Sequence, residues 1–214
     1  MQLLKVFCSD DGKFGDSTAI ILDEDNKLNP SERQVIAANS GLDEVAFIDN
    51  VSSGQISIYN PLQEVAFAGQ IVVGAAWFWR NVLKKPLEQI VCRDFTVDVG
   101  SDEKSAWTLA PVNQMPPWDI IYEEDLQKLE KMSQLEAGHA MIWSWLDRKK
   151  GEVRARTFAP DWGIPEAEVN GSGSILLAHE IGRKLVVRHG LGSTINVEPI
   201  DDEFCRLSGF VVKS

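Results

Sequence analysis

Two apolar segments of the chain each begin with small residues, a pattern typical of helix starts that can bind an anion. The first opens with Ala68 and Gly69, the second with Gly171, Ser172 and Gly173. A helix N-terminus presents unpartnered backbone N–H groups and the positive end of the helix dipole, so it favours a carboxylate. Glycine lets a ligand approach that backbone closely. If the two starts face each other across a cleft, they form an anion site; the alternative is that the glycines only pack the helices against a sheet.

The elements that position these helix starts follow one plan twice. Apolar helices are predicted over residues 68–83 and, after the small residues 171–174, over 175–183; we expect both to be buried. A helix over 30–39 has Asn29 as its N-cap and Pro30 in its first turn. Alternating apolar residues predict strands on both sides of each apolar helix. The predicted strands are 3–7, 18–22, 45–48, 55–59, 89–92, 95–99, 106–109, 139–146, 152–158, 184–188, 193–197 and 209–213.

The order of these elements predicts the fold. A helix buried on all sides needs a sheet curled around it. We therefore predict an α/β (α+β) protein of two pseudo-symmetric halves, each a curved mixed sheet wrapped around a central helix. The clearest break is the stretch from Gln114 to Pro117. It divides the chain into residues 1–113 and 114–214, with the last strand able to return to the first half. An acidic helix is expected over 122–133.

Several motifs of the chain, in their order, resemble those of one known family. Residues 41–47 (GLDEVAF) are similar to the segment L-S-E-T-A-F of the PhzF (phenazine-biosynthesis-like) isomerases. Residues 59–70 (YNPLQEVAFAGQ) resemble the turn that leads into E-x-x-F-x-G-H, and residues 158–166 (FAPDWGIPE) match F-A-P-x-x-G-I-x-E. Asn170-Gly171-Ser172 follows where the family has A-T-G-S, and His189-Gly190 stands where the family has Q-G.

The resemblance implies the fold of diaminopimelate epimerase, which agrees with the two halves predicted above. It also implies a cofactor-independent isomerase that moves a proton on a small cyclic or amino-acid-derived carboxylate, with Glu44 as the acid–base group. An enclosed carboxyl can be tuned toward neutral pH by burial, which suits that role. The resemblance places six further residues at the ligand. These substrate-binding candidates are Gly69, Gln70, Glu168, Gly171, Ser172 and His189.

The chain departs from the family at three places in its site, one of which is residues 191–193, where the family's Arg-Pro-Ser after Q-G is absent. Gln70 stands in place of the family's histidine; it can form a hydrogen bond to a ligand but cannot titrate. Ala167 stands in place of an aspartate, and Glu168 lies one residue further on. These departures leave an alternative open, in which the protein is a catalytically inactive relative that binds a small anion or a protein partner through the cleft.

Composition limits the remaining possibilities. The net charge is −11 and no long basic run is present, which argues against nucleic acid or an anionic membrane as a partner. No segment reaches the roughly 18 apolar residues of a membrane span, and the N-terminus lacks the pattern of a secretory signal. The cysteines Cys8, Cys92 and Cys205 are far apart and form no CxxC pair. They indicate reduced thiols in a cytoplasmic protein without a metal site.

Four tryptophans suggest an interface. Trp77 and Trp79 lie two positions apart on the first apolar helix, and Trp143 and Trp145 lie two positions apart on a predicted strand. From the side-chain repeat of a helix and of a strand, we expect two of the four tryptophans to face away from the core of their own unit. Exposed aromatic surface of this kind is typical of a homodimer or interdomain interface.

Overall fold

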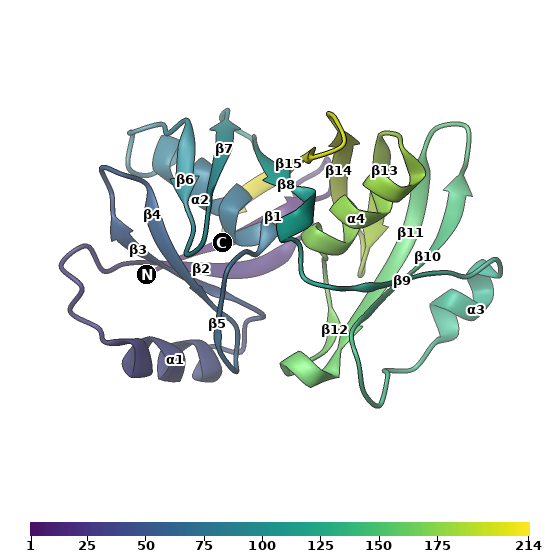
Figure 1. Cartoon of the computed structure of the whole chain (residues 1–214), viewed down its shortest axis with the longest axis horizontal. Coiled ribbons are helices and arrows are strands. Elements are labelled where there is room, and N and C mark those ends of the chain that lie inside the picture. The colour runs from purple at the N-terminus through teal and green to yellow at the C-terminus, as the bar shows by residue number, and fades with distance from the viewer.

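The computed structural model describes residues 1–214 as two units side by side, each a curved sheet with a helix inside it (Figure 1). The first unit has the strands β1 (Gln2–Cys8), β2 (Asp16–Leu22), β3 (Val45–Asn50), β4 (Gln55–Tyr59), β5 (Glu64–Val65), β6 (Gln89–Val91), β7 (Thr96–Ser101) and β8 (Ser105–Pro111). Its helices are α1 (Pro30–Asn39) and α2 (Gly69–Asn81).

The second unit follows the 3-10 turn η1 (Val112–Gln114). Its strands are β9 (Asp119–Tyr122), β10 (Ala140–Asp147), β11 (Glu152–Ala159), β12 (Ile164–Ala167), β13 (Leu185–His189), β14 (Ser193–Pro199) and β15 (Phe204–Lys213). Its helices are α3 (Leu126–Lys131), the 3-10 turn η2 (Pro160–Trp162) and α4 (Gly171–Ile181).

The two units repeat one topology. In the first, β2 and the parallel β3 are joined through α1, β3 pairs antiparallel with β4, and the short β5 folds back on β4 before α2 leads to β6, parallel to β4. In the second, β9, α3, β10, β11, β12, α4 and β13 repeat these steps with the same pairings. The predicted pair of similar halves, each a mixed sheet around a helix, is thus confirmed.

The sheets of the two units differ in closure, and β15 belongs to both. The first sheet runs in the order β1-β2-β3-β4-β6-β7-β8-β15 and closes because β15 also pairs with β1. The second continues from β15 through β14, β13, β11, β10 and β9, and its last strand has a free edge. The early residues of β15 pair with β14 and β8, and its last residues pair with β1. Strand β15 therefore joins the sheets of the two units.

The central helices are buried as their composition predicts. In α2, 11 of its 13 residues are buried, and the indole N–H groups of Trp77 and Trp79 donate to the carbonyls of Glu103 and Val51, both at 3.0 Å. These bonds give the buried indole N–H groups the hydrogen-bond partners that burial would otherwise deny them. A single cluster of 40 buried apolar residues includes side chains of both units. The helix starts are therefore held between two packed sheets.

Helix α1 packs outside the first sheet and begins where the sequence predicts. Asn29 and Glu32 form a reciprocal capping box. Arg33 on its inner face is buried and forms ion pairs with Asp23 (2.7 Å) and Asp49 (2.6 Å), which anchors the helix to the strands beneath it. None of these residues lines the cleft; because Asp23 also accepts hydrogen bonds from the N–H groups of Lys27 and Leu28, the network fixes the loop between β2 and α1.

Other parts of the second unit differ from the sequence-based expectation. The helix expected over 122–133 forms only over α3, because Asp125 caps its first turn and Tyr122 ends the strand β9. The short strands β5 and β12 were not predicted. The final strand begins at Phe204 rather than at residue 209, since its early residues pair with β8 and β14.

The tryptophans predicted to be exposed are mostly buried. Trp77, Trp79 and Trp143 are 8%, 0% and 8% exposed, and Trp145 is half-buried. A helix inside a closed sheet has no outward face, so residues two apart can both be covered. These side chains therefore provide no exposed surface for a homodimer, which stays a prediction without this support.

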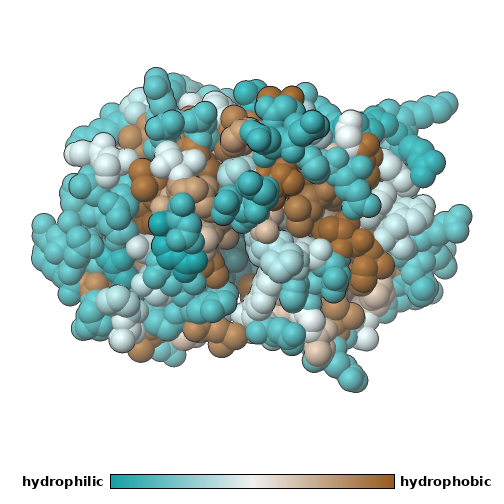
Figure 2. All heavy atoms as spheres, viewed as in Figure 1, coloured by the Kyte–Doolittle hydropathy of each residue, from teal (hydrophilic) through white to brown (hydrophobic).

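The molecular surface is largely hydrophilic on the face shown in Figure 2, with apolar residues visible mainly near its middle and on the second unit. None of the helices is at once long and apolar enough to cross a membrane.

Candidate active site

The starts of α2 and α4 meet between the two units. A Cβ atom placed on Gly69 would lie 3.2 Å from the Cα of Gly171, and one on Gly171 would lie 3.1 Å from the Cα of Gly69. Leu207 of β15 crowds both positions, with its Cδ2 atom 2.6 Å and 3.0 Å from the same two Cβ positions. Any side chain here would push the helix starts apart, so both glycines are required by close packing.

The two helix starts differ in how their N–H groups are used. The N-cap of α2, Ala68, offers no side-chain acceptor, and the N–H groups of Gly69, Gln70 and Ile71 have no acceptor within the protein. In α4, the side chain of Asn170 accepts a hydrogen bond from the N–H of Gly173 (2.8 Å). The start of α2 is therefore the freer of the two to bind an anion.

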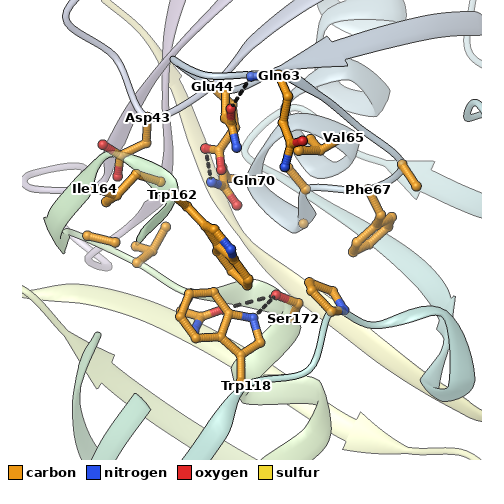
Figure 3. A pocket seen from close by; sticks show the side chains of 18 of the residues that line it. Asp43, Glu44, Gln63, Val65, Phe67, Gln70, Trp118, Trp162, Ile164 and Ser172 are labelled. Carbon is orange, nitrogen blue, oxygen red and sulfur yellow. Dashed lines mark hydrogen bonds between the residues drawn. The ribbon is translucent and has the colours of Figure 1, made fainter. Parts of the chain in front are cut away.

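A cavity of about 380 Å³ opens at the start of α2, between the two units (Figure 3). Of the predicted site residues, Glu44, Gly69, Gln70 and Ser172 line it, while Gly171 lies behind Gly69. The walls have two characters. Carboxyl and amide groups come from Asp43, Glu44, Asn60, Gln63, Glu64 and Gln70; apolar groups come from Val65, Phe67, Pro116, Trp118, Trp162, Ile164, Ala167 and Val169.

Glu44 is the predicted acid–base residue, and its surroundings favour the protonated form. Its carbonyl accepts a hydrogen bond from the Thr18 hydroxyl (3.3 Å), and its side chain accepts one from the amide of Gln70 in the first turn of α2. Burial, with a smaller contribution from the charge of Asp43, raises the pKa of Glu44 to about 8; the bond from Gln70 acts in the opposite direction. At neutral pH this carboxyl therefore holds a proton that it can donate.

Two further carboxyl groups lie near Glu44, and neither was among the predicted site residues. Asp43 lines the same cavity, and burial together with the charge of Glu168 raises its pKa to about 6. Asp16 of β2 is buried behind them, with one oxygen lacking any hydrogen bond. Burial and the charges of Asp43, Glu44 and Glu168 hold its pKa well above the usual range. Of these three carboxyl groups, Glu44 and Asp16 therefore favour the protonated form at neutral pH, whereas Asp43 is the readiest to ionise.

The apolar wall is built around Trp118, which sequence reasoning also missed. Its indole N–H donates to the hydroxyl of Ser172 (2.8 Å), which in turn donates to the side-chain oxygen of Asn170 (3.2 Å). The ring of Trp118 lies edge-to-face with Trp162 at 4.7 Å, and His139 stacks on Trp162 at 4.4 Å. The hydroxyl of Ser172 is therefore engaged in positioning this wall. The position of Trp118 just after Pro116-Pro117 was the only sequence signal for it.

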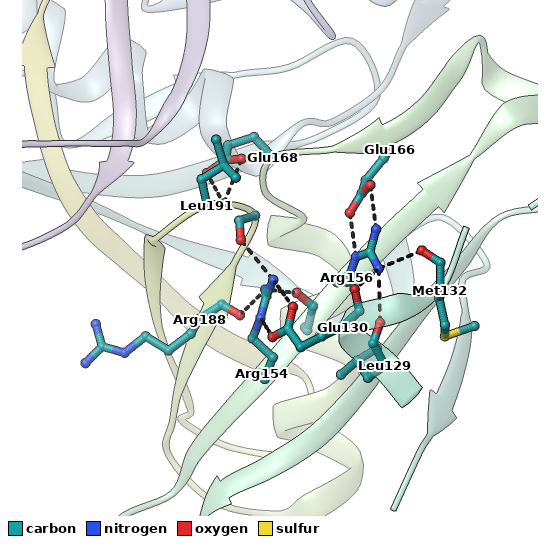
Figure 4. A network of polar contacts seen from close by, with 11 residues as sticks. Leu129, Glu130, Met132, Arg154, Arg156, Glu166, Glu168, Arg188 and Leu191 are labelled. Atoms are coloured by element: carbon teal, nitrogen blue, oxygen red, sulfur yellow. Dashed lines mark hydrogen bonds and ion pairs between the residues drawn. The ribbon is translucent and has the colours of Figure 1, made fainter. Parts of the chain in front are cut away.

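Glu168 and His189, the two remaining substrate-binding candidates, do not line this cavity. Glu168 accepts hydrogen bonds from the backbone N–H of Leu191 (3.1 Å) and the Ser193 hydroxyl (2.6 Å) and borders a separate polar hollow (Figure 4). Ala167, the residue before it, borders both this hollow and the cavity.

His189 is 1% exposed and shares a hydrogen bond of 3.2 Å with Ser174. Burial, with a smaller contribution from the charge of Arg154, lowers the pKa of His189 to about 3, so the ring is neutral. Its role here is structural. No group of three or more His, Cys, Asp or Glu side chains is arranged to hold a metal ion.

Two units of repeated topology, with a cavity where the starts of their central helices meet, define the fold. Several solved protein structures share this fold. The chain is similar to a phenazine biosynthesis protein of the PhzF family from Bacillus anthracis, with a TM-score of 0.78, 16% identity and coverage of 99% of this chain and 95% of the other. A PhzF family protein from Enterococcus faecalis gives a TM-score of 0.77, 15% identity and coverage of 99% and 95%.

A hydroxyproline epimerase from Agrobacterium vitis, with bound trans-4-hydroxy-L-proline, is similar over 100% of this chain and 90% of its own length, with a TM-score of 0.66 and 10% identity. No family model matches the sequence. The protein thus has the PhzF-like fold, and the fold implied by the sequence resemblance is confirmed.

Proposed function

We propose that this protein is a PhzF-like, cofactor-independent isomerase that moves a proton on a small cyclic or amino-acid-derived carboxylate. Glu44 is its acid–base group. The observation that carries the proposal is the position of the Glu44 carboxyl, which lines the cavity beside the unpartnered N–H groups of Gly69 and Gln70. A ligand carboxylate bound to these N–H groups has its neighbouring carbon close to a protonated acid.

The shape of the cavity supports a small ring as the ligand. Its volume of about 380 Å³ suits a small molecule, and the rings of Trp118 and Trp162 form one wall. Aromatic side chains favour contact with a flat or unsaturated ring. The neighbouring fold with bound trans-4-hydroxy-L-proline is an epimerase for a cyclic amino acid, which is consistent with this ligand size.

The structure also offers an observation in favour of the alternative, a relative that binds without catalysis. Ala167 presents only a methyl group where the resembling motif has an aspartate, and Gln70 cannot titrate. In that case the same N–H groups would bind a carboxylate, and Glu44 would serve only as a hydrogen-bond donor. The two functions differ in one respect, whether hydrogen is exchanged on the bound ligand.

Exchange of ligand hydrogen with D₂O distinguishes the isomerase from the non-catalytic relative. Wild type and Glu44→Gln are incubated with L-proline, trans-4-hydroxy-L-proline and β,γ-unsaturated cyclohexene carboxylates, and deuterium entry is followed by proton NMR. Saturation transfer in the same tubes reports binding. We expect exchange with wild type and a loss of at least about 100-fold in Glu44→Gln, since acid–base groups contribute factors of that order or more. Glu64→Gln, a second carboxyl of the same cavity, is the matched control. Binding without exchange in wild type favours the non-catalytic alternative.

A further inference from the structure

Asp43 is the part of the cavity that the proposed function leaves without a role. It lines the same cavity as Glu44, and no lysine, arginine or hydrogen-bond donor of the protein pairs with its side chain. Asp43 and Glu44 both precede β3, which begins at Val45, so the alternation of a strand does not force the two side chains apart. In Figure 3 the Glu44 carboxyl points toward Gln70, and the Asp43 carboxyl lies at the edge of the cavity near Ile164. Asp43 is half-buried, so leaving its carboxyl without a partner keeps part of the cost of desolvation.

The groups around the pair do not neutralise it. Asp16 of β2 is buried nearby, Glu64 of β5 lines the same cavity, and the charge of Glu168, outside the cavity, also acts on Asp43; all three are acidic. The one basic residue of the cavity, Arg93, is bound to Asp94 (2.8 Å) and to the carbonyl of Glu64 (3.3 Å). Like charges in one enclosed site separate the protonation of two carboxyls, leaving one protonated and the other ionised near neutral pH.

We propose that Asp43 is a second proton-transfer residue, which removes a proton from the ligand while Glu44 supplies one. This proposal rests on the proposed function. The resembling motif carries serine at this position, so the carboxyl is a feature of this chain. It stands in a site whose other departures, Gln70 and Ala167, remove two titratable groups. Asp43 supplies one titratable group to the cavity, at another position of the chain.

The step balances on a β,γ-unsaturated carboxylate. Ionised Asp43 takes the proton from the α-carbon, and the electrons of that C–H bond form the α,β double bond. The electrons of the former β,γ double bond take the proton of Glu44 at the γ-carbon, and Glu44 is left as a carboxylate. Asp43 now holds the proton and Glu44 the charge. The proton then passes from Asp43 to Glu44, toward the more basic group, and the starting state is restored.

The ligand-free protein provides the first test. The side-chain carboxyl carbons are followed by carbon-13 NMR from pH 4 to pH 9 in wild type, Asp43→Ser and Glu44→Gln. We expect the Glu44 signal of wild type to titrate later than that of Asp43, and Asp43→Ser to move the Glu44 midpoint to lower pH; Glu44→Gln identifies the Asp43 signal. Two independent titrations, neither changed by replacing the other residue, would overturn the proposal.

The origin of the transferred hydrogen provides the second test. A β,γ-unsaturated cyclohexene carboxylate with deuterium on its α-carbon is mixed with excess enzyme in H₂O for a single turnover. If two carboxyls act, Asp43 removes the deuterium and Glu44 delivers ordinary hydrogen to the γ-carbon. If a single carboxyl acts, it removes the deuterium from the α-carbon and delivers the same deuterium to the γ-carbon. We expect ordinary hydrogen at the γ-carbon, a turnover at least about 100-fold slower in Asp43→Ser with unchanged binding, and partial recovery in Asp43→Glu.

Failure of this proposal is distinct from failure of the proposed function. Deuterium carried to the γ-carbon, with Asp43→Ser as fast as wild type, leaves the isomerase intact with Glu44 as its only carrier. An absence of exchange on every compound counts against the isomerase itself. In that case the titration of the ligand-free protein decides whether the two carboxyls share a proton.

Discussion

The raised pKa of Glu44 predicts that this residue destabilises the fold at neutral and alkaline pH. Its folded-state pKa is about 8, against an ordinary value of 4.5. The folded state therefore binds more protons than the unfolded state between these pH values, and the free energy of unfolding falls as pH rises through this range. A pKa difference of that size corresponds to roughly 5 kcal/mol at most. Because water can enter the cavity and solvate the ionised carboxyl, we expect about half of that.

Glu44→Gln keeps the shape of the side chain and removes its titration. We expect the variant to match wild type near pH 5 and to exceed it by about 2–3 kcal/mol at pH 8, from the reasoning just given. Urea unfolding followed by tryptophan fluorescence at four pH values measures the difference. Glu180→Gln, at an exposed position of α4, controls for the loss of one negative charge. A difference between Glu44→Gln and wild type that stays constant from pH 5 to pH 8 would refute the assignment of Glu44 as a protonated acid.

Three further changes test the scaffold of the site. Gly69→Ala places a Cβ 2.6 Å from the Cδ2 of Leu207, and we expect it to cost about 1–3 kcal/mol in urea unfolding. Leu207→Val removes that atom, so the double variant should recover part of the loss, and strictly additive effects would contradict this packing. Trp118→Phe removes the donor to Ser172; it should weaken ligand binding measured by saturation transfer, and unchanged binding would argue against the wall. Arg33→Met leaves two buried carboxylates unpaired, so we expect a loss of about 3–5 kcal/mol that diminishes at acidic pH in the same unfolding assay.

Local signals explain what the sequence predicted about the fold. The start of α1 follows from Asn29 and Glu32, which cap it within one turn. The two central helices follow from apolar residues on every face, which only a surrounding sheet can cover. Strand β9 could not be predicted in this way, because its partner β10 is distant in the sequence and the pairing is parallel. The acidic residues after Tyr122 resemble a helix until that pairing is known.

In the candidate site, too, the residues with a local sequence signal could be predicted and the others could not. Gly69, Gln70 and Ser172 lie at helix starts, and a helix start is visible in the sequence. Glu168 lies next to Ala167, yet of the two only Ala167 lines the cavity, a difference that the sequence does not mark. Asp43 and Trp118 come from segments between regular elements, whose path depends on contacts with both units. Their arrival in the cavity could not be derived from spacing alone.

The claim on which the site depends is that a carboxylate binds at the paired helix starts, and amide NMR tests it most directly. Nitrogen-15-labelled protein is titrated with trans-4-hydroxy-L-proline and with benzoate, each beside its carboxamide analogue. We predict that a carboxylate shifts the amide signals of Gly69 and Gln70 downfield, with smaller changes at Gly171, and that the uncharged carboxamides do not. Shifts confined to the rim near Arg93, or equal shifts from acid and amide, would contradict this account of the cleft.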